Sequence, residues 1–229
     1  MRVDLNADVA ESAEDLALLD VATSANVCCG AYAGGVDLMV KACERAARRG
    51  VTIGAQVGYA DPEGFGRRRL DPPGGELLTC LREQIDLLAD IADAAGTPLA
   101  YVKPHGALYN TIVSDERQAS VVVEAVAPYG LPLLGLPQAA SLRLARAEGL
   151  PVAVEGFADR AYRPDGTLVP RSEPGAVLTD PGVVAAQAVR LAAGVDSLCV
   201  HGDSPGALGL ARSVREALEA AGFALGPFA

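Results

Sequence analysis

Short apolar runs rich in valine and leucine recur along the chain, and each is followed by a segment with helical spacing. The runs largely lack the alternating polar positions of a half-exposed strand, so they are typical of strands buried on both faces of a parallel sheet. The pattern predicts seven such strands, at residues 2–8, 24–29, 51–57, 100–106, 131–136, 151–157 and 197–203.

The segments between these runs place apolar residues three and four positions apart, as the buried face of a helix does. One series spans residues 36–50 and another spans 78–96, and each ends at a glycine. Two more helices are expected to begin at Asp180 and at Ser204. Each of these residues precedes a proline, and an N-cap residue followed by proline is a common helix start.

Strands that alternate with helices imply a parallel sheet joined by right-handed crossovers. Seven or eight such strands can close into a barrel, and a doubly wound open sheet is the alternative that the spacing leaves open. No repeat or linker divides the chain, so we expect residues 1–229 to form a single domain. Two irregular stretches, 58–76 and 158–176, are long for a compact domain, and such loops are commonly functional.

Composition narrows the class of protein. Half of the residues are apolar and 21% are charged, which suits a globular chain with a sizeable core. The net charge of −10 repels phosphate backbones, so we expect no nucleic-acid partner. No apolar run approaches the ~20 residues of a membrane span. The acidic first dozen residues do not resemble a signal peptide, and we therefore expect a cytoplasmic protein without a membrane partner.

The chain contains five cysteines, an odd number, and no C-x-x-C pair. Most of them lie within apolar segments, so we expect buried and reduced thiols. Cys29 precedes a glycine at the end of a predicted strand, and it is the candidate if a cysteine acts as a nucleophile.

Polar residues gather where the predicted strands end. In parallel α/β folds the ligand site lies beyond the carboxyl ends of the strands, so side chains that follow five different strands are expected at one rim. They are Asn6, Asp8, Glu11, Gln56, Tyr59, Asp61, Lys103, His105, Tyr109, Asn110, Glu155, Asp159, Arg160, His201 and Asp203.

The only two histidines, His105 and His201, each follow an apolar run and precede a glycine. Neutral imidazole moves protons near neutral pH, so both are predicted to be catalytic. Lys103 is expected to stabilise an oxyanion, or alternatively to form a salt bridge with Asp8 or Glu11. Asp8 stands at the end of the first predicted strand and is predicted to act as a base or to orient water.

Asp203 is predicted to orient a catalytic neighbour, and its alternative is a carboxylate near a helix start. Arginines in the long loops could clamp a carboxylate in bidentate fashion, and we predict that Arg160 and Arg171 bind substrate. The run at 67–69 is either a similar clamp or a solvated surface. The remaining predicted substrate-binding residues are Asn6, Glu11, Tyr59 and Asn110.

A common nucleotide-binding signature is missing from the chain. No G-x-x-x-x-G-K-[ST] run occurs, and the Gly-Phe-Gly run at 64–66 is too short to count as a phosphate loop. A nucleotide would therefore not be held by a P-loop in this chain.

Several motifs, in order along the whole chain, resemble the LamB/YcsF family. The most specific are V-K-P-H-G-A-L-Y-N at 102–110, F-A-D-R-A-Y at 157–162 and G-T-L-V-P-R-S at 166–172. The others are D-L-N-A-D at 4–8, T-S-A-N-V-C-C-G at 23–30, G-F-G-R-R-R at 64–69 and L-C-V-H-G-D at 198–203.

The resemblance implies a seven-stranded parallel β/α barrel of the glycoside hydrolase/deacetylase type. It implies 5-oxoprolinase activity, in which the lactam of 5-oxo-L-proline is hydrolysed to L-glutamate while ATP is hydrolysed as a co-substrate. It also implies that the chain is one component of that enzyme and acts with separate partner chains, subunits B and C.

The chain departs from the family pattern where a metal could bind. Tyr32 and Gln56 stand in place of histidines, and Gly35 stands in place of an aspartate. Imidazoles near Asp8 could hold a divalent cation in related barrels, and these replacements are poor ligands, so we predict no metal site. Two alternatives remain: a metal-dependent deacetylase or hydrolase on the same barrel, and a non-catalytic or altered-specificity paralogue with its pocket filled by Tyr32 or Gln56.

Overall fold

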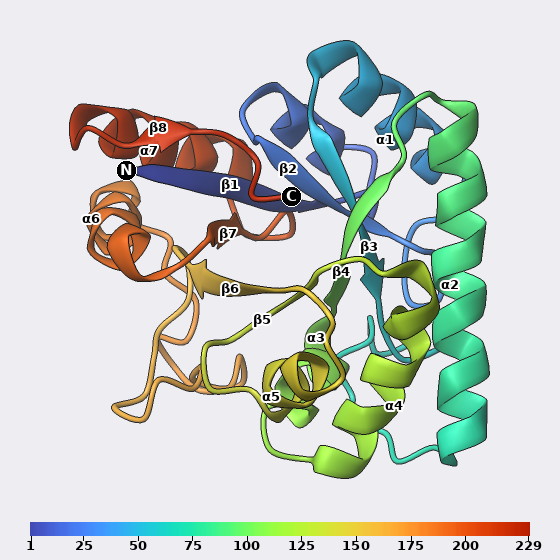
Figure 1. The fold of residues 1–229 in the computed structure, drawn as a ribbon. Helices are drawn as coiled ribbons and strands as arrows, with labels where there is room; N and C mark the ends of the chain where they lie inside the picture. The colour runs from blue at the N-terminus through green and yellow to red at the C-terminus, as the bar shows by residue number, and fades with distance from the viewer.

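Seven parallel strands close into a barrel in the computed structural model, which describes residues 1–229 (Figure 1). The strands follow chain order around the barrel, and β7 and β2 both pair with β1, so each strand has two neighbours. They are β1 Arg2–Val9, β2 Ser24–Cys28, β3 Thr52–Val57, β4 Leu99–Pro104, β5 Leu133–Gly135, β6 Val152–Phe157 and β7 Ser197–Val200.

This architecture confirms the seven predicted strands and decides for the closed barrel over the open sheet. The fifth strand is shorter than its predicted run at 131–136, because only three residues of that run form the strand. A further strand, β8 (Ala224–Leu225), pairs with the start of β1 and was not predicted. Two residues are too few to show a hydrophobic period.

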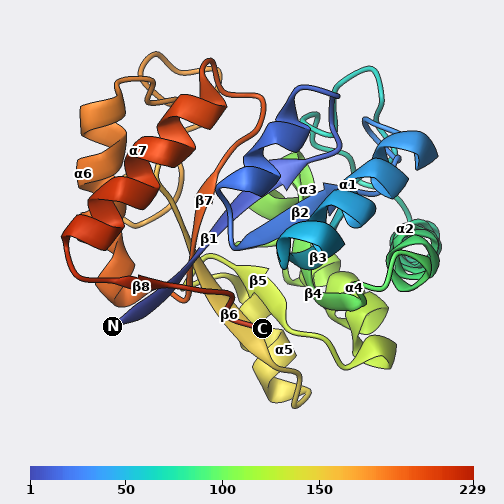
Figure 2. The same cartoon turned by 90° about the horizontal axis from the view of Figure 1, so that it is seen from above.

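Helices surround the barrel and cover its outer face (Figure 2). None of them combines the length and apolar composition that crossing a membrane requires. The α-helices are α1 Val36–Arg49, α2 Gly74–Ala94, α3 Gly106–Thr111, α4 Glu116–Val126, α5 Ala140–Ala147, α6 Pro181–Leu191 and α7 Ala207–Ala220; the 3-10 helices are η1 Asp15–Asp20, η2 Ala127–Tyr129 and η3 Ala192–Gly194.

The structure confirms one of the two predicted helix starts and contradicts the other. The Asp180 side chain accepts a hydrogen bond from the backbone N–H of Val183, so it caps α6 as expected. The helix start predicted at Ser204 is wrong, because α7 begins at Ala207 after the N-cap Gly206. The Ser204 hydroxyl instead donates to Asp159 at 2.7 Å, and this bond draws the side chain away from the helix end.

Alternate residues of β1 face opposite sides of the barrel wall. The inward side chains of Asp4, Asn6 and Asp8 are buried and form a polar column, here called the β1 column, through the barrel. Asp4 accepts hydrogen bonds from the hydroxyls of Ser24 and Ser197, and Asn6 donates to Ser197 at 2.6 Å. Asp8 is the last member and lies nearest the carboxyl ends of the strands.

Candidate active site

A cavity of about 720 Å³ opens at the carboxyl ends of the strands. Its walls come from the ends of several strands and from the two long irregular stretches recognised in the sequence. Asp8, Lys103, His105 and His201 all line it. Four polar side chains from three separate strand ends therefore meet in one cavity, which is the convergence that the sequence pattern led us to expect.

Lys103 lies between two carboxylates at the cavity wall. Its Nζ atom is 3.1 Å from Asp8 Oδ1 and 2.7 Å from Glu155 Oε1, and its side chain is 3% exposed. Cys199 Sγ is a third neighbour, at 3.1 Å. Burial by itself favours the neutral amine, but the charge of Asp8 and its neighbours raises the pKa of Lys103 well above its ordinary value. Lys103 is therefore an ammonium group that faces the cavity, and it forms the salt bridge to Asp8 that was one of its two predicted roles.

Asp8 is buried and ionised. Besides Lys103, the Asn26 amide donates to its Oδ1 at 2.8 Å. Burial favours the neutral acid, yet the Lys103 ammonium outweighs it and holds the pKa of Asp8 below its ordinary range. A carboxylate with a lowered pKa is a weak proton acceptor, so the geometry favours the water-orienting role of Asp8 over the role of base.

Asp159 fixes the ring of His201. The Nδ1 atom lies 2.8 Å from Asp159 Oδ1, and the His201 backbone N–H and the Ser204 hydroxyl both donate to Oδ2. Burial alone would favour the neutral acid, but the charge of His201 and these hydrogen bonds lower the pKa of Asp159. A carboxylate that accepts the Nδ1 proton leaves Nε2 of a neutral imidazole unprotonated, as a general base requires.

His105 has both ring nitrogens engaged within the protein. Its Nε2 lies 3.1 Å from the Phe65 carbonyl oxygen, which can only accept, so Nε2 carries the proton. Its Nδ1 lies 3.2 Å from the Gln56 amide nitrogen, and its ring stacks on Tyr32 with centroids 4.0 Å apart. Burial lowers the pKa of His105 to about 4. A neutral ring held at both nitrogens fits a positioning role better than the proton transfer predicted for it.

Steric contacts explain why the residue after His105 is a glycine. Gly106 has a φ of 56°, in the left-handed region that glycine tolerates. A Cβ atom there would lie 2.5 Å from the Gly66 carbonyl oxygen. Glycine therefore lets the stretch 58–76 close onto the end of β4, which places the Phe65 carbonyl against His105.

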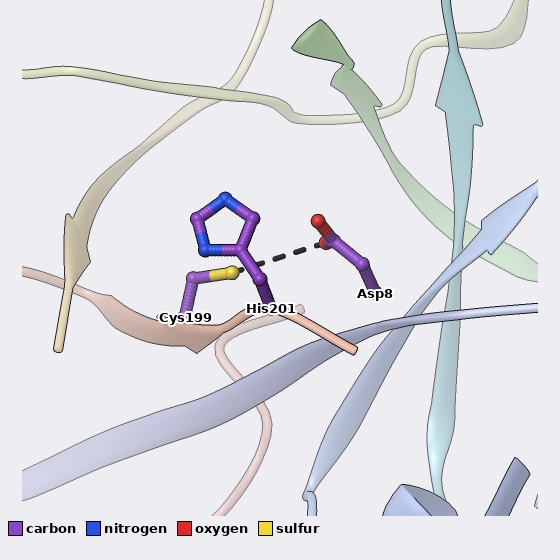
Figure 3. A group of neighbouring side chains, drawn as sticks. All are labelled: Asp8, Cys199 and His201. Atoms are coloured by element: carbon purple, nitrogen blue, oxygen red, sulfur yellow. Dashed lines mark hydrogen bonds between the residues drawn. The ribbon is translucent and has the colours of Figure 1, made fainter. Parts of the chain in front are cut away.

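Figure 3 shows Cys199 beside Asp8 and His201, with its Sγ atom 3.8 Å from Asp8 Oδ1. Burial raises the pKa of the Cys199 thiol well above its ordinary value, so it is a neutral thiol rather than a nucleophilic thiolate. Burial raises the pKa of Cys29 in the same way. Cys29 also does not line the cavity, which removes it as a candidate nucleophile.

A serine near the site has the spacing of a hydrolase nucleophile but not its position. Residues 202–206 read G-D-S-P-G, which has the G-x-S-x-G form of a nucleophile elbow. Ser204 does not line the cavity, and its hydroxyl donates to the carboxylate of Asp159. Ser204 therefore supports Asp159 and is not a nucleophile at this site.

Two sets of side chains have the spacing of metal ligands, with ligand atoms within 4.8 Å of one another: Asp8 with Cys199 and His201, and Asp8 with Glu11 and His105. The first set does not fit a divalent cation, because the Lys103 ammonium already contacts both Asp8 and Cys199. In the second set the Gln56 amide engages His105 Nδ1. Burial and the charge of Asp8 also raise the pKa of Glu11 to about 9, so Glu11 is a protonated, weak ligand at neutral pH.

Arginines from the two long irregular stretches also line the cavity. Arg160 and Arg171, both predicted to bind substrate, line it, as does Asn110. Arg160 is 4% exposed; its Nε and Nη2 atoms donate to the carbonyl oxygens of Ala176 and Val169, and it has no carboxylate partner. The remaining Nη1 group makes no hydrogen bond within the protein, so it is available to a ligand.

Four other predicted site residues lie outside the cavity lining. Asn6 belongs to the β1 column beneath it, and the Glu11 side chain is 3% exposed, with its Oε1 atom 3.5 Å from His105 Nδ1. The Tyr59 hydroxyl donates to Gln118, so the prediction that Tyr59 binds substrate does not match its position. Asp203 bonds to arginines instead of orienting a catalytic side chain, and those arginines are Arg67 and Arg171.

Sequence reasoning gave no role to Glu155, Asp159 and Cys199. A signal for Glu155 existed, because an acid inside the apolar run of β6 must be paired when it is buried. Asp159 follows the same strand and was placed at the rim without a partner. For Cys199 the apolar surroundings pointed only to the core, and nothing in the pattern indicated that Lys103 lies beside it.

The closed barrel, with a polar cavity at the carboxyl ends of its strands, defines a β/α-barrel protein with its ligand site at that mouth. Within this class the chain belongs to the LamB/YcsF family, whose model matches residues 3–229. This confirms the resemblance drawn from the motifs.

Similar proteins match along nearly the full length. The 5-oxoprolinase A subunit of Streptomyces avermitilis is 51% identical, with 99% of this chain and 100% of that protein covered. The 5-oxoprolinase A subunit of Mycobacterium avium is 48% identical, with 99% and 98% covered. The lactam utilization protein from Thermus thermophilus superposes with a TM-score of 0.92 at 38% identity, with 99% of each chain covered.

A family 4 carbohydrate esterase from Streptomyces lividans superposes with a TM-score of 0.58 at 12% identity, with 98% of this chain and 91% of that chain covered. This likeness concerns the fold alone. It agrees with the expected barrel of the glycoside hydrolase/deacetylase type.

Proposed function

We propose that this chain is the A subunit of an ATP-dependent 5-oxoprolinase and that its cavity holds the lactam while the ring opens. Full-length similarity to proteins of that name and to a lactam utilization protein supports the proposal. The observation that carries it is the meeting of the Lys103 ammonium and the His201–Asp159 pair in one cavity. Opening a lactam with water needs a base, a positive charge for the oxyanion and a proton for the leaving nitrogen.

Each of these groups has its own role in the proposed reaction. His201 Nε2 takes a proton from water as the water oxygen bonds to the lactam carbonyl carbon, and Asp159 stabilises the imidazolium that forms. The Lys103 ammonium stabilises the oxyanion, while Asp8 and Glu155 hold its position. When the C–N bond breaks, His201 returns the proton to the ring nitrogen, which becomes the amine of glutamate.

The substrate carboxylate is assigned to Arg160. A buried guanidinium without a carboxylate partner favours an anion, and its free Nη1 group can donate to one. Asn110 also lines the cavity. The lactam ring would then lie between Arg160 and Lys103, with its carbonyl toward the ammonium.

The same proposal includes ATP as the co-substrate and subunits B and C as partner chains. The γ-phosphoryl group of ATP would activate the lactam carbonyl oxygen before water attacks and would then depart as phosphate, with ADP as the other product. The non-catalytic alternative expected Tyr32 or Gln56 to fill the pocket. Tyr32 is instead packed behind His105, and Gln56 forms part of the wall of an open cavity of about 720 Å³. An open, charged cavity favours the enzyme.

The test is release of glutamate from 5-oxoproline by this chain assembled with subunits B and C, with and without ATP. We expect ATP-dependent release, and Lys103→Met should lower kcat by about 100-fold or more, since removing one oxyanion-stabilising group typically costs that much. Lys41→Met is the matched control, because Lys41 is the other lysine of the chain and is exposed on α1. No glutamate from the complete assembly would exclude this function.

A further inference from the structure

The loop side of the cavity carries far more positive than negative charge. Five arginines line the cavity, whereas Asp8 is the one acidic residue in its lining. The protein as a whole carries a net charge of −10, so this concentration does not reflect its composition. The five are Arg67, Arg69, Arg160, Arg163 and Arg171.

Two of these arginines are neutralised by carboxylates of their own. Arg163 pairs with Glu173 at 2.6 Å, and Arg69 lies 3.5 Å from Asp115. Neither of them needs a ligand to balance its charge.

The other three arginines share a single carboxylate. Arg67 Nη2 bonds to Asp203, and Arg171 reaches the two oxygens of the same carboxylate at 3.3 and 3.4 Å. Arg160 has none. Burial and the nearby charge of Arg171 lower the pKa of Arg160 to about 10, which agrees with guanidinium groups that lie close enough to repel each other. Two of the three guanidinium charges therefore have no carboxylate of their own within salt-bridge distance.

A substrate carboxylate at Arg160 balances only one of these two charges. We propose that Arg67 and Arg171, tied together by Asp203, form a second subsite that binds a phosphate-class oxyanion. Guanidinium groups match the spacing of phosphate oxygens in bidentate pairs, and two of them suit an anion of more than one charge. The cavity also has room for it, since about 720 Å³ is within the range that holds drug-sized ligands and a five-membered lactam is far smaller.

The geometry of the loops supports a built subsite. Arg67 comes from the stretch after β3, Arg171 from the stretch after β6, and Asp203 follows β7. Two arginines from different loops therefore meet at a carboxylate from a third loop. The Arg67 guanidinium also lies 4.9 Å above the ring centroid of Phe65. Asp203 and Phe65 thus hold the two arginines in place before any ligand arrives.

Inorganic phosphate titrated into the purified full chain tests the subsite by calorimetry. We expect saturable binding of one phosphate, and Arg171→Gln should weaken it at least tenfold, because a charge-assisted hydrogen bond is worth about one to two powers of ten in affinity. Arg67→Gln should act in the same direction. Arg163→Gln is the matched control, because it removes the same charge from the same loop but from a pair that is already neutral.

The subsite is refuted if phosphate does not saturate, or if Arg163→Gln weakens binding as much as Arg171→Gln. Thermal unfolding of each variant checks that the fold is intact. The titration uses no lactam and no partner chain, so it can fail while the glutamate assay succeeds, and the reverse also holds.

The same chemistry would bind free phosphate or a phosphoryl group carried by the substrate. Phosphonoacetate, which carries a carboxylate and a phosphonate, is compared with methylphosphonate, which carries only the phosphonate. Binding that is tenfold tighter for phosphonoacetate, and loses that advantage in Arg160→Gln, assigns both groups to one ligand. Equal binding of the two compounds assigns the subsite to free phosphate.

Discussion

The carboxylate of Asp159 contacts His201 twice, through the ring and through the backbone. Nδ1 lies 2.8 Å from Oδ1, and the His201 backbone N–H donates to Oδ2 at 3.1 Å. The two contacts fix the rotation of the ring and the position of its proton together. The catalytic proposal depends on this pair, because only the tautomer with a free Nε2 can accept a proton from water.

Asp159→Asn tests the tautomer. The asparagine amide can donate to Nδ1, which would move the proton of a neutral imidazole to Nε2 and remove the base. We expect kcat for glutamate release to fall by about 100-fold or more, with a small change in KM, as loss of a general base typically gives. Asp165→Asn, in an exposed turn, should keep the wild-type rate. An unchanged rate in Asp159→Asn would show that His201 is not the base.

Lys103→Met tests the buried charges. Without the ammonium, Asp8 and Glu155 are left buried with no positive partner, so the free energy of unfolding should fall by about 3–5 kcal/mol. Adding Glu155→Gln removes one of the two carboxylates and should recover part of the loss. Urea denaturation of both single variants and the double variant measures this coupling. Simple additivity of the two single changes would contradict it.

Glu11 predicts a pH dependence of stability. Burial, followed by repulsion from Asp8, raises its pKa from 4.5 to about 9 in the folded protein. Between those values the folded state holds a proton that the unfolded state has lost, so the contribution of Glu11 to stability is complete below about pH 4.5 and is lost as the pH rises toward 9.

Glu11→Gln should therefore gain stability relative to wild type as the pH rises from 5 to 8. Urea denaturation at both pH values measures the difference in the free energy of unfolding between the two proteins. Groups that titrate alike in both proteins do not contribute to this difference. A difference that does not change with pH would mean that the Glu11 carboxyl titrates normally in the folded protein.

The position of Lys103 also leads to a prediction about metal binding. Its ammonium contacts Asp8 and Cys199, two members of the set completed by His201. Lys103→Ala removes the competing positive charge and leaves oxygen, sulfur and nitrogen donors that suit Zn²⁺.

We expect the Lys103→Ala variant to bind about one equivalent of Zn²⁺, detected by elemental analysis after dialysis and by a rise in Tm. The wild-type chain, treated in the same way, should retain much less. The double variant Lys103→Ala, Cys199→Ala is the control, since it lacks the sulfur ligand and should lose the gain. Equal zinc in the wild type and the Lys103→Ala variant would contradict the idea that the lysine occupies the cation position.

The barrel could be predicted from sequence because burial leaves a continuous pattern. Strands such as 24–29 and 51–57 are apolar throughout most of their length, and their number and alternation with helices restrict the topology to a few choices. Closure itself was not decided by the pattern, since it depends on β7 pairing with β1, almost the full length of the chain apart. β8 was missed because it is too short to show a period.

The positions of some candidate site residues could be predicted, for a similar reason. Position at or just after the end of a strand identified Asp8, Lys103 and His201, because the carboxyl ends of parallel strands meet at one mouth. The direction of a side chain could not be predicted in the same way, since Tyr59 follows β3 but its side chain turns toward Gln118. Pairings between distant residues, such as Lys103 with Glu155, arise only when the barrel closes, so no local pattern reports them.

The β1 column has a consequence for folding specificity. Asp4, Asn6 and Asp8 each bond to partners on other strands, while Val3, Leu5 and Ala7 pack in the apolar core. If β1 slipped by one residue, three polar groups would lie among the helices and three apolar ones would face the hydroxyls and amides inside. The β1 column, which ends at the cavity with the Asp8 carboxylate, therefore also penalises wrong strand alignments while the chain folds.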